Sequence, residues 1–310
     1  MAETTSPGRL YVCATPIGNL EDVSFRLLRV LREVSVVAAE DTRQAKKLLG
    51  HYGITAQVVS LHEHNEARRA PKLLARILAG ESVAVVSDAG MPAISDPGTC
   101  LVRAAAEHGV DVTVIPGPSA LVTALAGSGL PAQRFAFEGF LPHKPRRRRA
   151  RLEALKDDER TLVFFEAPHR LKETLADMRD ILGDRQACVA RELTKLHEEW
   201  QRGPLAQLAE AWNVREPLGE YVIVVAGAKD RGDRDDGPPR GPSDAEGLQD
   251  VARRVAEHMS RGLDKKEAVR AVALETGISR RTVYRAALNL SAREDRERGS
   301  DVPNDNDSGP

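Results

Sequence analysis

The chain has 310 residues, of which 41% are hydrophobic and 29% charged, and its formal net charge is −1. This length is too great for one ordinary hydrophobic core and predicts two or three domains, while the composition is typical of a soluble globular protein. The near-neutral charge provides no overall attraction to nucleic acid, so only a local patch of positive charge could bind such a partner.

The cysteines and the hydropathy pattern indicate a cytoplasmic protein. Cys13, Cys100 and Cys188 are odd in number and lie far apart in apolar stretches, which argues against a disulfide framework or a zinc cluster and favours a reducing compartment. The N-terminal segment MAETTSPGRL lacks the apolar centre of a secretory signal. No run of about 18 apolar residues occurs, so we expect no membrane association.

Short β-branched runs alternate with amphipathic helical stretches in the first part of the chain. Strands are predicted at residues 10–14, 34–38, 57–61, 83–87 and 112–115. Helical spacing recurs at Val23, Leu27, Leu31 and Val34, and again at Leu73, Leu74, Ile77 and Leu78. This alternation predicts a mostly parallel sheet with crossover helices, an α/β domain over residues 9–127.

The rest of the chain divides into four further parts. Residues 128–228 predict a second α/β domain, with strands at 135–140, 161–166, 187–190 and 220–226 and helices at 170–182 and near 205–212. Residues 229–247, KDRGDRDDGPPRGPSDAEG, have too little apolar surface to fold and predict a flexible linker. A small helical module follows at 248–290, and the polar residues 291–310 are expected to form a disordered tail.

Three loops follow predicted strands of the first domain, and these loops favour a ligand site. Their sequences are TPIGNL (15–20), SDAGMPAISDPG (87–98) and PGPSALVTAL (116–125). In the second loop Asp96 is expected to cap a helix whose first turn holds Pro97, and Pro118 suits the first position of another helix. TPIGNL alone is also consistent with a plain turn, and it lacks the G-x-G-x-x-G pattern of a dinucleotide site. Because all three loops lie at the carboxyl edge of one sheet, they predict a ligand crevice.

Seven motifs in order carry a resemblance to a known family. They are TPIGNL, AAEDTR (38–43), SDAGMPAISDPG, PGPSALVTAL, EGFLPHKPRRRR (138–149), FFEAPHR (164–170) and RELTKLHEE (191–199). Together they resemble the 16S ribosomal RNA (cytidine 2′-O) methyltransferases, a branch of the tetrapyrrole methylase superfamily. The resemblance covers about residues 9–227 and the helical module. Met91 and Phe165 depart from the family, which more often has a small polar residue and a tyrosine there.

The resemblance implies two α/β domains of the tetrapyrrole methylase type, with S-adenosylmethionine in the cleft between them, and a homodimer. The substrate that it implies is the small ribosomal subunit, methylated on a cytidine ribose of the 16S RNA. The matching cofactor contacts are Pro16, Ile17, Gly18, Asp88, Ala89, Gly90, Ile94, Ser119, Ala120, Glu166 and Ala167.

Transfer of a methyl group to a ribose hydroxyl benefits from a positioned base, which adds roughly 10²–10⁴-fold. The candidates in the matching motifs are Asp41, Glu166, Glu192 and Lys195. For each candidate, a structural salt bridge with a nearby Arg43, Arg170 or Arg191 is an equally consistent interpretation. His62 and His64 lack a third ligand and are interpreted as part of a polar loop, and the reaction requires no metal.

A dense positive run, KPRRRRAR (144–151), is interpreted as a contact for RNA phosphates, with a solvated surface as the alternative. The predicted RNA contacts are Arg43, Lys144, Arg146, Arg147, Arg148, Arg149, Arg170 and Arg191. Only 12 of the 310 residues are Phe, Trp or Tyr, so base stacking cannot dominate recognition. Recognition by shape and phosphate contacts is expected instead.

The C-terminal module reads as a helix-turn-helix. Its apolar face comprises Ala268, Val269, Val272 and Ala273, with Gly277 ending one helix and Ser279 capping the next. Residues 248–290 hold nine Lys/Arg against five Asp/Glu, a net charge of +4, so the module is predicted to help dock RNA. A packing module without RNA contact is the alternative.

Two other functions compete with this interpretation. A tetrapyrrole (precorrin-type) C-methyltransferase would share the fold and cofactor, but the arginine run and the helical module do not suit a small acidic macrocycle. The other is a DNA-binding regulator built on the C-terminal module, in which the α/β part senses a ligand. A single recognition helix beside so large a cleft-forming region argues against it.

Overall fold

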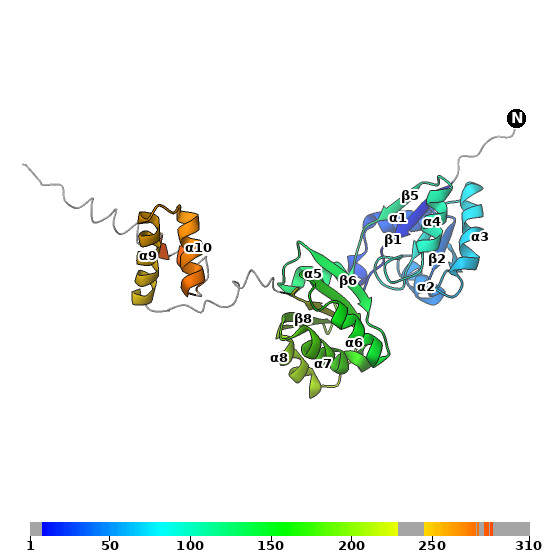
Figure 1. Cartoon of the computed structure of the whole chain (residues 1–310). Helices are drawn as coiled ribbons and strands as arrows, with labels where there is room; N and C mark the ends of the chain where they lie inside the picture. The colour runs from blue at the N-terminus through cyan, green and yellow to red at the C-terminus, as the bar shows by residue number, and fades with distance from the viewer. Residues whose placement is uncertain (1–7, 229–244, 277, 279–281, 285, 288–310) are drawn as a thin grey trace, which may run out of the picture. The chain divides into compact units, whose positions relative to one another are not determined.

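A computed structural model describes residues 8–228, 245–276, 278, 282–284 and 286–287 (Figure 1). The chain divides between Ala228 and Lys229 into two compact units. Separate hydrophobic clusters fill the two units, so each has a core of its own.

The first unit begins with a five-stranded parallel sheet in the order β3-β2-β4-β1-β5. Its strands are β1 (Leu10–Cys13), β2 (Val36–Ala39), β3 (Gln57–Ser60), β4 (Val83–Val86) and β5 (Val112–Ile115). The three central strands are almost wholly buried because helices cover both faces, which explains their continuous apolar sequences. Four of the five strands fall within the predicted runs. β2 begins at Val36 and not at Val34, because Val34 is the C-cap of the preceding helix.

Two helices cover each face of this sheet. One face packs against α1 (Phe25–Glu33) and α2 (Thr42–His51), and the other against α3 (Glu66–Leu78) and α4 (Thr99–Glu107). The register pairs Cys13 with both Val86 and Ile115, so β1, β4 and β5 end side by side. The loops that follow these strands therefore leave the sheet at one edge.

A mixed sheet in the order β6-β7-β10-β8-β9 completes the first unit. Its strands are β6 (Phe135–Phe140), β7 (Thr161–Glu166), β8 (Gln186–Arg191), β9 (Glu199–Pro204) and β10 (Tyr221–Val225). Only β6 and β7 are parallel. One face packs against α5 (Ala120–Ser128), and the other against α6 (Pro145–Ala154), α7 (Leu171–Leu182) and α8 (Leu205–Asn213). Two short 3-10 helices are η1 (Leu20–Asp22) and η2 (Pro168–Arg170).

Two predicted helix starts are wrong. The N-cap of α4 is Gly98, and the carboxylate that accepts hydrogen bonds from Gly98 N (2.9 Å) and Cys100 N (2.7 Å) belongs to Glu66 at the start of α3. Asp96 is therefore not the cap. Helix α5 begins at Ala120 with Ser119 as its N-cap, so Pro118 precedes the cap instead of opening the helix.

The second unit contains α9 (Ala245–Ser260), α10 (Lys265–Thr276) and helical residues at 282–284 and 286–287. Its core includes the predicted apolar residues Ala268, Val269 and Val272, with Ala273 packed against it. Helix α9 begins three residues inside the predicted linker. The rest of that linker, Gly277, Ser279 and the predicted tail lie outside the described residues. Among the helices that are described, none is long and apolar enough to span a bilayer.

Candidate active site

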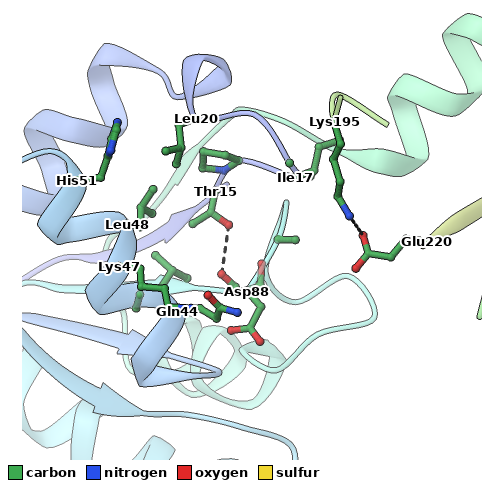
Figure 2. Close-up of a pocket in the computed structure, with 16 residues that line it drawn as sticks. Thr15, Ile17, Leu20, Gln44, Lys47, Leu48, His51, Asp88, Lys195 and Glu220 are labelled. Carbon is green, nitrogen blue, oxygen red and sulfur yellow. Dashed lines mark hydrogen bonds and ion pairs between the residues drawn. The ribbon is translucent and has the colours of Figure 1, made fainter. Parts of the chain in front are cut away.

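Two adjoining cavities lie at the carboxyl edge of the parallel sheet. The first, here called the α2 cavity, has a volume of about 410 Å³ and is lined by the loop after β1, one face of α2 and Lys195 (Figure 2). The second, the aromatic cavity, has a volume of about 330 Å³ and is lined by the loop after β4, the start of α5, Phe140 and Phe165. Four residues line both: Ile17, Asp88, Ala89 and Glu220. These four form the junction of the two cavities.

Ten of the eleven predicted cofactor contacts line these cavities. Pro16, Ile17 and Gly18 line the α2 cavity, Asp88 and Ala89 line both, and the aromatic cavity adds Gly90, Ile94, Ser119, Ala120 and Glu166. Ala167 lines neither, and its backbone N–H donates to Glu166 Oε1 at 2.9 Å. The three strand-end loops therefore converge, as their sequences predict.

Backbone hydrogen bonds join the first two loops. Thr15 N donates to Gly90 O at 2.9 Å, and Gly90 N donates back to Thr15 O at 3.1 Å. The Thr15 and Ser87 hydroxyls donate to the Ser87 and Gly90 carbonyls. Gly90 has a φ of +85°, and an added Cβ would lie 3.3 Å from Ile17 Cγ2. Its backbone therefore requires glycine on grounds of both conformation and space.

Backbone strain is concentrated in two loops beside the cavities. Ala93, Ser95, Glu192 and Thr194 have φ values between 50° and 66°, and these four are the non-glycine residues with positive φ in the described part of the chain. Such conformations cost about 1–3 kcal/mol each and cluster at functional sites. The loop holding Glu192 and Thr194 packs on the loop after β1, where a Cβ on Gly18 would lie 2.5 Å from Lys195 Cγ.

The aromatic cavity is rich in carboxylates. Five line it: Glu40, Asp88, Asp96, Glu166 and Glu220. Burial, reinforced by the charges of Glu40 and Asp88, raises the pKa of Asp96 to about 6. Burial and then Asp88 likewise raise the pKa of Glu40. The cavity therefore favours a positively charged ligand.

Sequence reasoning missed Glu40, Asp96 and Glu220 as site residues. Glu40 and Asp96 lie within the quoted motifs AAEDTR and SDAGMPAISDPG, so the signal was present there. Asp96 was instead assigned to a helix cap. Glu220 lies just before β10, outside every motif, and only the packing of the second sheet brings it to the junction.

Asp41 and Glu166 have structural partners as well as positions near the site. Asp41 caps α2 and pairs with Arg43 at 2.7 Å, and the hydrogen bond from the Arg43 side chain lowers its pKa to about 2. It lines neither cavity, but its N–H donates to Asp88 Oδ1 at 2.9 Å. Glu166 is 2% exposed, accepts from Thr174 Oγ1 at 2.6 Å and lies 3.5 Å from Arg170 Nε.

Lys195 bridges two glutamates. Its Nζ lies 2.9 Å from Glu192 Oε1 and 3.0 Å from Glu220 Oε2, and Figure 2 shows the second contact. Burial opposes the charge, but the hydrogen bonds to both carboxylates outweigh it and raise the pKa of Lys195. Lys195 is therefore a protonated cation and not a base. Glu192 lines neither cavity and pairs with Lys195, whereas Arg191 pairs with Glu199 at 3.4 Å.

The predicted RNA-binding arginines divide into buried and exposed groups. Arg148 is 3% exposed and pairs with Asp177 at 2.7 Å and Glu173 at 3.3 Å. Arg170 is also buried and donates to Leu141 O at 2.7 Å. These two side chains hold the interior together, so the expectation that they face RNA is corrected.

The other arginines and Lys144 remain at the surface to different degrees. Arg149 pairs with Asp177, and Arg43 and Arg191 have the partners given above. Lys144, Arg146 and Arg147 are exposed, and the described residues provide no ion-pair partner for them. Within the run 144–151, the side chains whose positive charge is not paired with a described carboxylate are therefore these three.

His62 and His64 have ring centroids 6.1 Å apart, edge to face. Among the described residues, no group of three or more His, Cys, Asp or Glu side chains could hold a metal ion.

Comparison with known proteins identifies the family. The family model for tetrapyrrole (corrin/porphyrin) methylases matches residues 9–209. The chain belongs to this family. Two solved structures share its fold: the methyltransferase CobJ (TM-score 0.55, 20% identity, 72% of this chain and 96% of that chain), and uroporphyrin-III C-methyltransferase from Thermus thermophilus complexed with S-adenosylhomocysteine (TM-score 0.50, 23% identity, 70% and 97%).

Much closer sequence relatives carry the name ribosomal RNA small subunit methyltransferase I. The Pseudomonas aeruginosa protein is 46% identical over 286 residues, which cover 91% of this chain and 98% of the relative. The Halalkalibacterium halodurans protein is 46% identical over 279 residues (89% and 93%). The Thermotoga maritima protein is 47% identical over 220 residues, which cover 71% of this chain but 99% of the relative.

Family membership confirms the predicted fold class, the methyltransferase activity and S-adenosylmethionine as the cofactor. The aromatic cavity suits that cofactor chemically, because its carboxylates complement a sulfonium cation and its aromatic wall suits an apolar, planar group. Phe165 contributes to that wall with its ring centroid 4.9 Å from Phe137 and 5.7 Å from Phe140.

Proposed function

We propose that the protein methylates the RNA of the small ribosomal subunit, at the ribose 2′-hydroxyl of a cytidine in 16S RNA. The observation that carries this proposal is the 46% identity with ribosomal RNA small subunit methyltransferase I over 91% of the chain. That match is much stronger than the likeness to the tetrapyrrole enzymes, which is 20–23% identical in CobJ and the uroporphyrin-III enzyme. A ribosomal substrate also places the reaction in the cytoplasm.

The cofactor lies in the aromatic cavity in this proposal. The contacts within that cavity are Gly90, Ile94, Ser119, Ala120 and Glu166, together with the junction residues Ile17, Asp88 and Ala89. Pro16, Gly18 and Ala167, which adjoin these residues in the chain, remain proposed contacts. Bound S-adenosylmethionine supplies an electrophilic methyl group on a sulfonium sulfur. Glu40 and Asp96 offer the negative charge that favours this cation, and the backbone of the β4 loop is held in place by Thr15 and Ser87.

A carboxylate at the junction takes the proton from the ribose hydroxyl. Of the residues first considered for this role, Asp41 and Glu192 lie outside the cavities, Lys195 is protonated, and Glu166 is enclosed by its own hydrogen bonds. Asp88 and Glu220 both line the junction, but the Lys195 ammonium 3.0 Å away neutralises Glu220. Asp88 makes no ion pair within the described residues, and we assign the proton acceptor to it.

The proposal assigns RNA contacts to α6 and, independently, to the C-terminal module. Lys144, Arg146 and Arg147 supply free positive charge at the start of α6. The Thermotoga maritima relative matches over 220 residues, a length close to that of the first unit, which supports the proposal that the module is separate from the catalytic body. We therefore expect a chain ending at Ala228 to bind cofactor normally and to show a raised KM for small subunits. Loss of cofactor binding would instead make the module part of the catalytic body.

The activity is tested with methyl-labelled cofactor and purified small subunits, with uroporphyrinogen as the competing acceptor. We expect label in 16S RNA, on a cytidine whose 3′ linkage resists alkaline hydrolysis because its 2′-hydroxyl is blocked. Mass spectrometry of nuclease fragments locates that nucleotide. Label on the macrocycle would favour the tetrapyrrole C-methyltransferase, and label on a base would overturn the ribose assignment. Sedimentation equilibrium tests the proposed homodimer.

A further inference from the structure

One face of α2 forms a wall of the α2 cavity. Gln44, Lys47, Leu48 and His51 line it, at helical spacings of three and four residues that bring them onto one face. Figure 2 shows these four side chains together on that helix, across the cavity from Lys195 and Glu220. The proposed transfer of the methyl group leaves this face without a role.

Two lysines line this cavity, and the charge of Lys47, unlike that of Lys195, is not neutralised by a described carboxylate. Lys195 is held by two carboxylates, whereas Lys47 is exposed and makes no ion pair with any residue that the structure describes. His51 contacts the ring of Tyr52 edge to face at 4.7 Å and is also exposed. One nitrogen of its neutral ring can donate a further hydrogen bond. This end of the cavity therefore favours an anion.

The two adjoining cavities thus have opposite preferences. The aromatic cavity gathers five carboxylates and suits a sulfonium cation, while the outer part of the α2 cavity suits a phosphate. Because Asp88 and Glu220 line both, a group bound in one cavity meets a group bound in the other at the junction. Methyl transfer requires such an approach, since the accepting oxygen has to lie close to and in line with the methyl carbon.

We propose that the α2 cavity binds the target nucleotide, with its phosphate against Lys47 and its ribose at the junction. This inference rests on the proposed function and specifies where the RNA enters. The volume of about 410 Å³ lies within the range of small-ligand sites. Pro16, Leu20 and Leu48 give an apolar wall for the base. Gln44 offers both an amide donor and a carbonyl acceptor to a base edge.

The decisive experiment compares Lys47→Gln with Lys46→Gln in the full-length protein. Lys46 is an exposed neighbour on the same helix that does not line the cavity, so it controls for a general loss of positive charge. With small subunits as substrate, Lys47→Gln should raise KM about five- to tenfold and reduce the salt slope by about 0.7, the value for one lost phosphate contact. Lys46→Gln should change KM less than twofold, and Lys47→Arg should restore it.

Calorimetry of S-adenosylmethionine binding separates this site from the cofactor site. All three variants should bind the cofactor as the parent does. Equal KM values in Lys47→Gln and Lys46→Gln, or weaker cofactor binding in Lys47→Gln, would overturn the assignment of the cavity. The parent protein provides the separate readout of function: if it does not methylate small-subunit RNA, the proposed function fails and this assignment fails with it. A parent that is active beside an unaffected Lys47→Gln variant contradicts the nucleotide site alone.

Discussion

The two sheets of the first unit contribute different kinds of groups to the site. The parallel sheet contributes backbone and carboxylates from the loops after β1, β2, β4 and β5, including Gly90 and Asp88. The mixed sheet contributes the aromatic wall, including Phe165, two further carboxylates, Glu166 and Glu220, and the exposed arginines of α6. Parallel strands end at one edge and so gather several loops, whereas antiparallel strands alternate in direction. Substitutions in the loops after the parallel strands should therefore affect cofactor binding and chemistry, whereas substitutions of the exposed cations on α6, and of Lys47 on α2, should affect substrate recognition.

The largest effect should come from Gly90→Val. A β-branched residue cannot adopt a φ of +85° without strain, and its Cβ would meet Ile17 at 3.3 Å. We expect cofactor affinity measured by calorimetry to fall more than about 100-fold, which corresponds to about 2.7 kcal/mol or more. Gly53→Val is the matched control, because Gly53 has a φ of +62° but open space around it. Similar cofactor binding in the two variants would contradict the placement of the cofactor.

Asp88→Asn should separate chemistry from binding within the same sheet. The asparagine Oδ1 can still accept the hydrogen bond from Asp41 N, so the loop should keep its conformation. The lost base should reduce kcat roughly 100-fold at saturating cofactor, within the range for general-base catalysis. The loss of one of the five carboxylates of the aromatic cavity should weaken cofactor binding by a smaller factor. Single-turnover methylation of small subunits measures this step. A variant with parental kcat would exclude Asp88 as the proton acceptor.

On the second sheet, Arg146→Gln combined with Arg147→Gln should raise KM for small subunits about tenfold. The two lost phosphate contacts should also reduce the salt slope by roughly 1.4. Cofactor affinity should stay at the parental value. Arg148→Gln should behave differently, because breaking its buried pair with Asp177 costs roughly 3 kcal/mol of folding stability. A double variant with an unchanged salt slope would make this run a solvated surface.

The sequence predicted the strands because the central ones are buried on both faces and therefore read as continuous apolar runs. It did not predict β9 or α6. β9 is a largely polar strand at the edge of its sheet, and α6 buries only Arg148 and Leu152, which leaves no apolar period to detect. The identity of the α4 cap also depended on folding, since Glu66 reaches it from 32 residues away. The junction of the two cavities likewise includes Glu220, which only tertiary packing brings there.

Asp96, a carboxylate in the loop after β4, should affect the stability of the protein as well as cofactor binding. Its pKa in the folded protein is about 6, above the ordinary value of 3.8 that it has in the unfolded chain. Between these values the folded protein binds a proton that the unfolded chain does not, so the contribution of Asp96 to stability rises as the pH falls from about 6 towards 4. Above pH 6 the buried charge is destabilising.

Asp96→Asn should therefore raise the Tm of the cofactor-free protein by roughly 2 °C at pH 8, and this gain should disappear near pH 4. Differential scanning fluorimetry across that range measures it, with the exposed Asp22→Asn as a control that should show no such pH dependence. The same carboxylate should attract the sulfonium of S-adenosylmethionine but not the neutral thioether of S-adenosylhomocysteine. The preference of the parent protein for the former should then be larger than that of the variant above pH 6 and should approach the variant's as the pH falls towards 4. A pH-independent difference in Tm would show that Asp96 is not held in an environment that disfavours its charge.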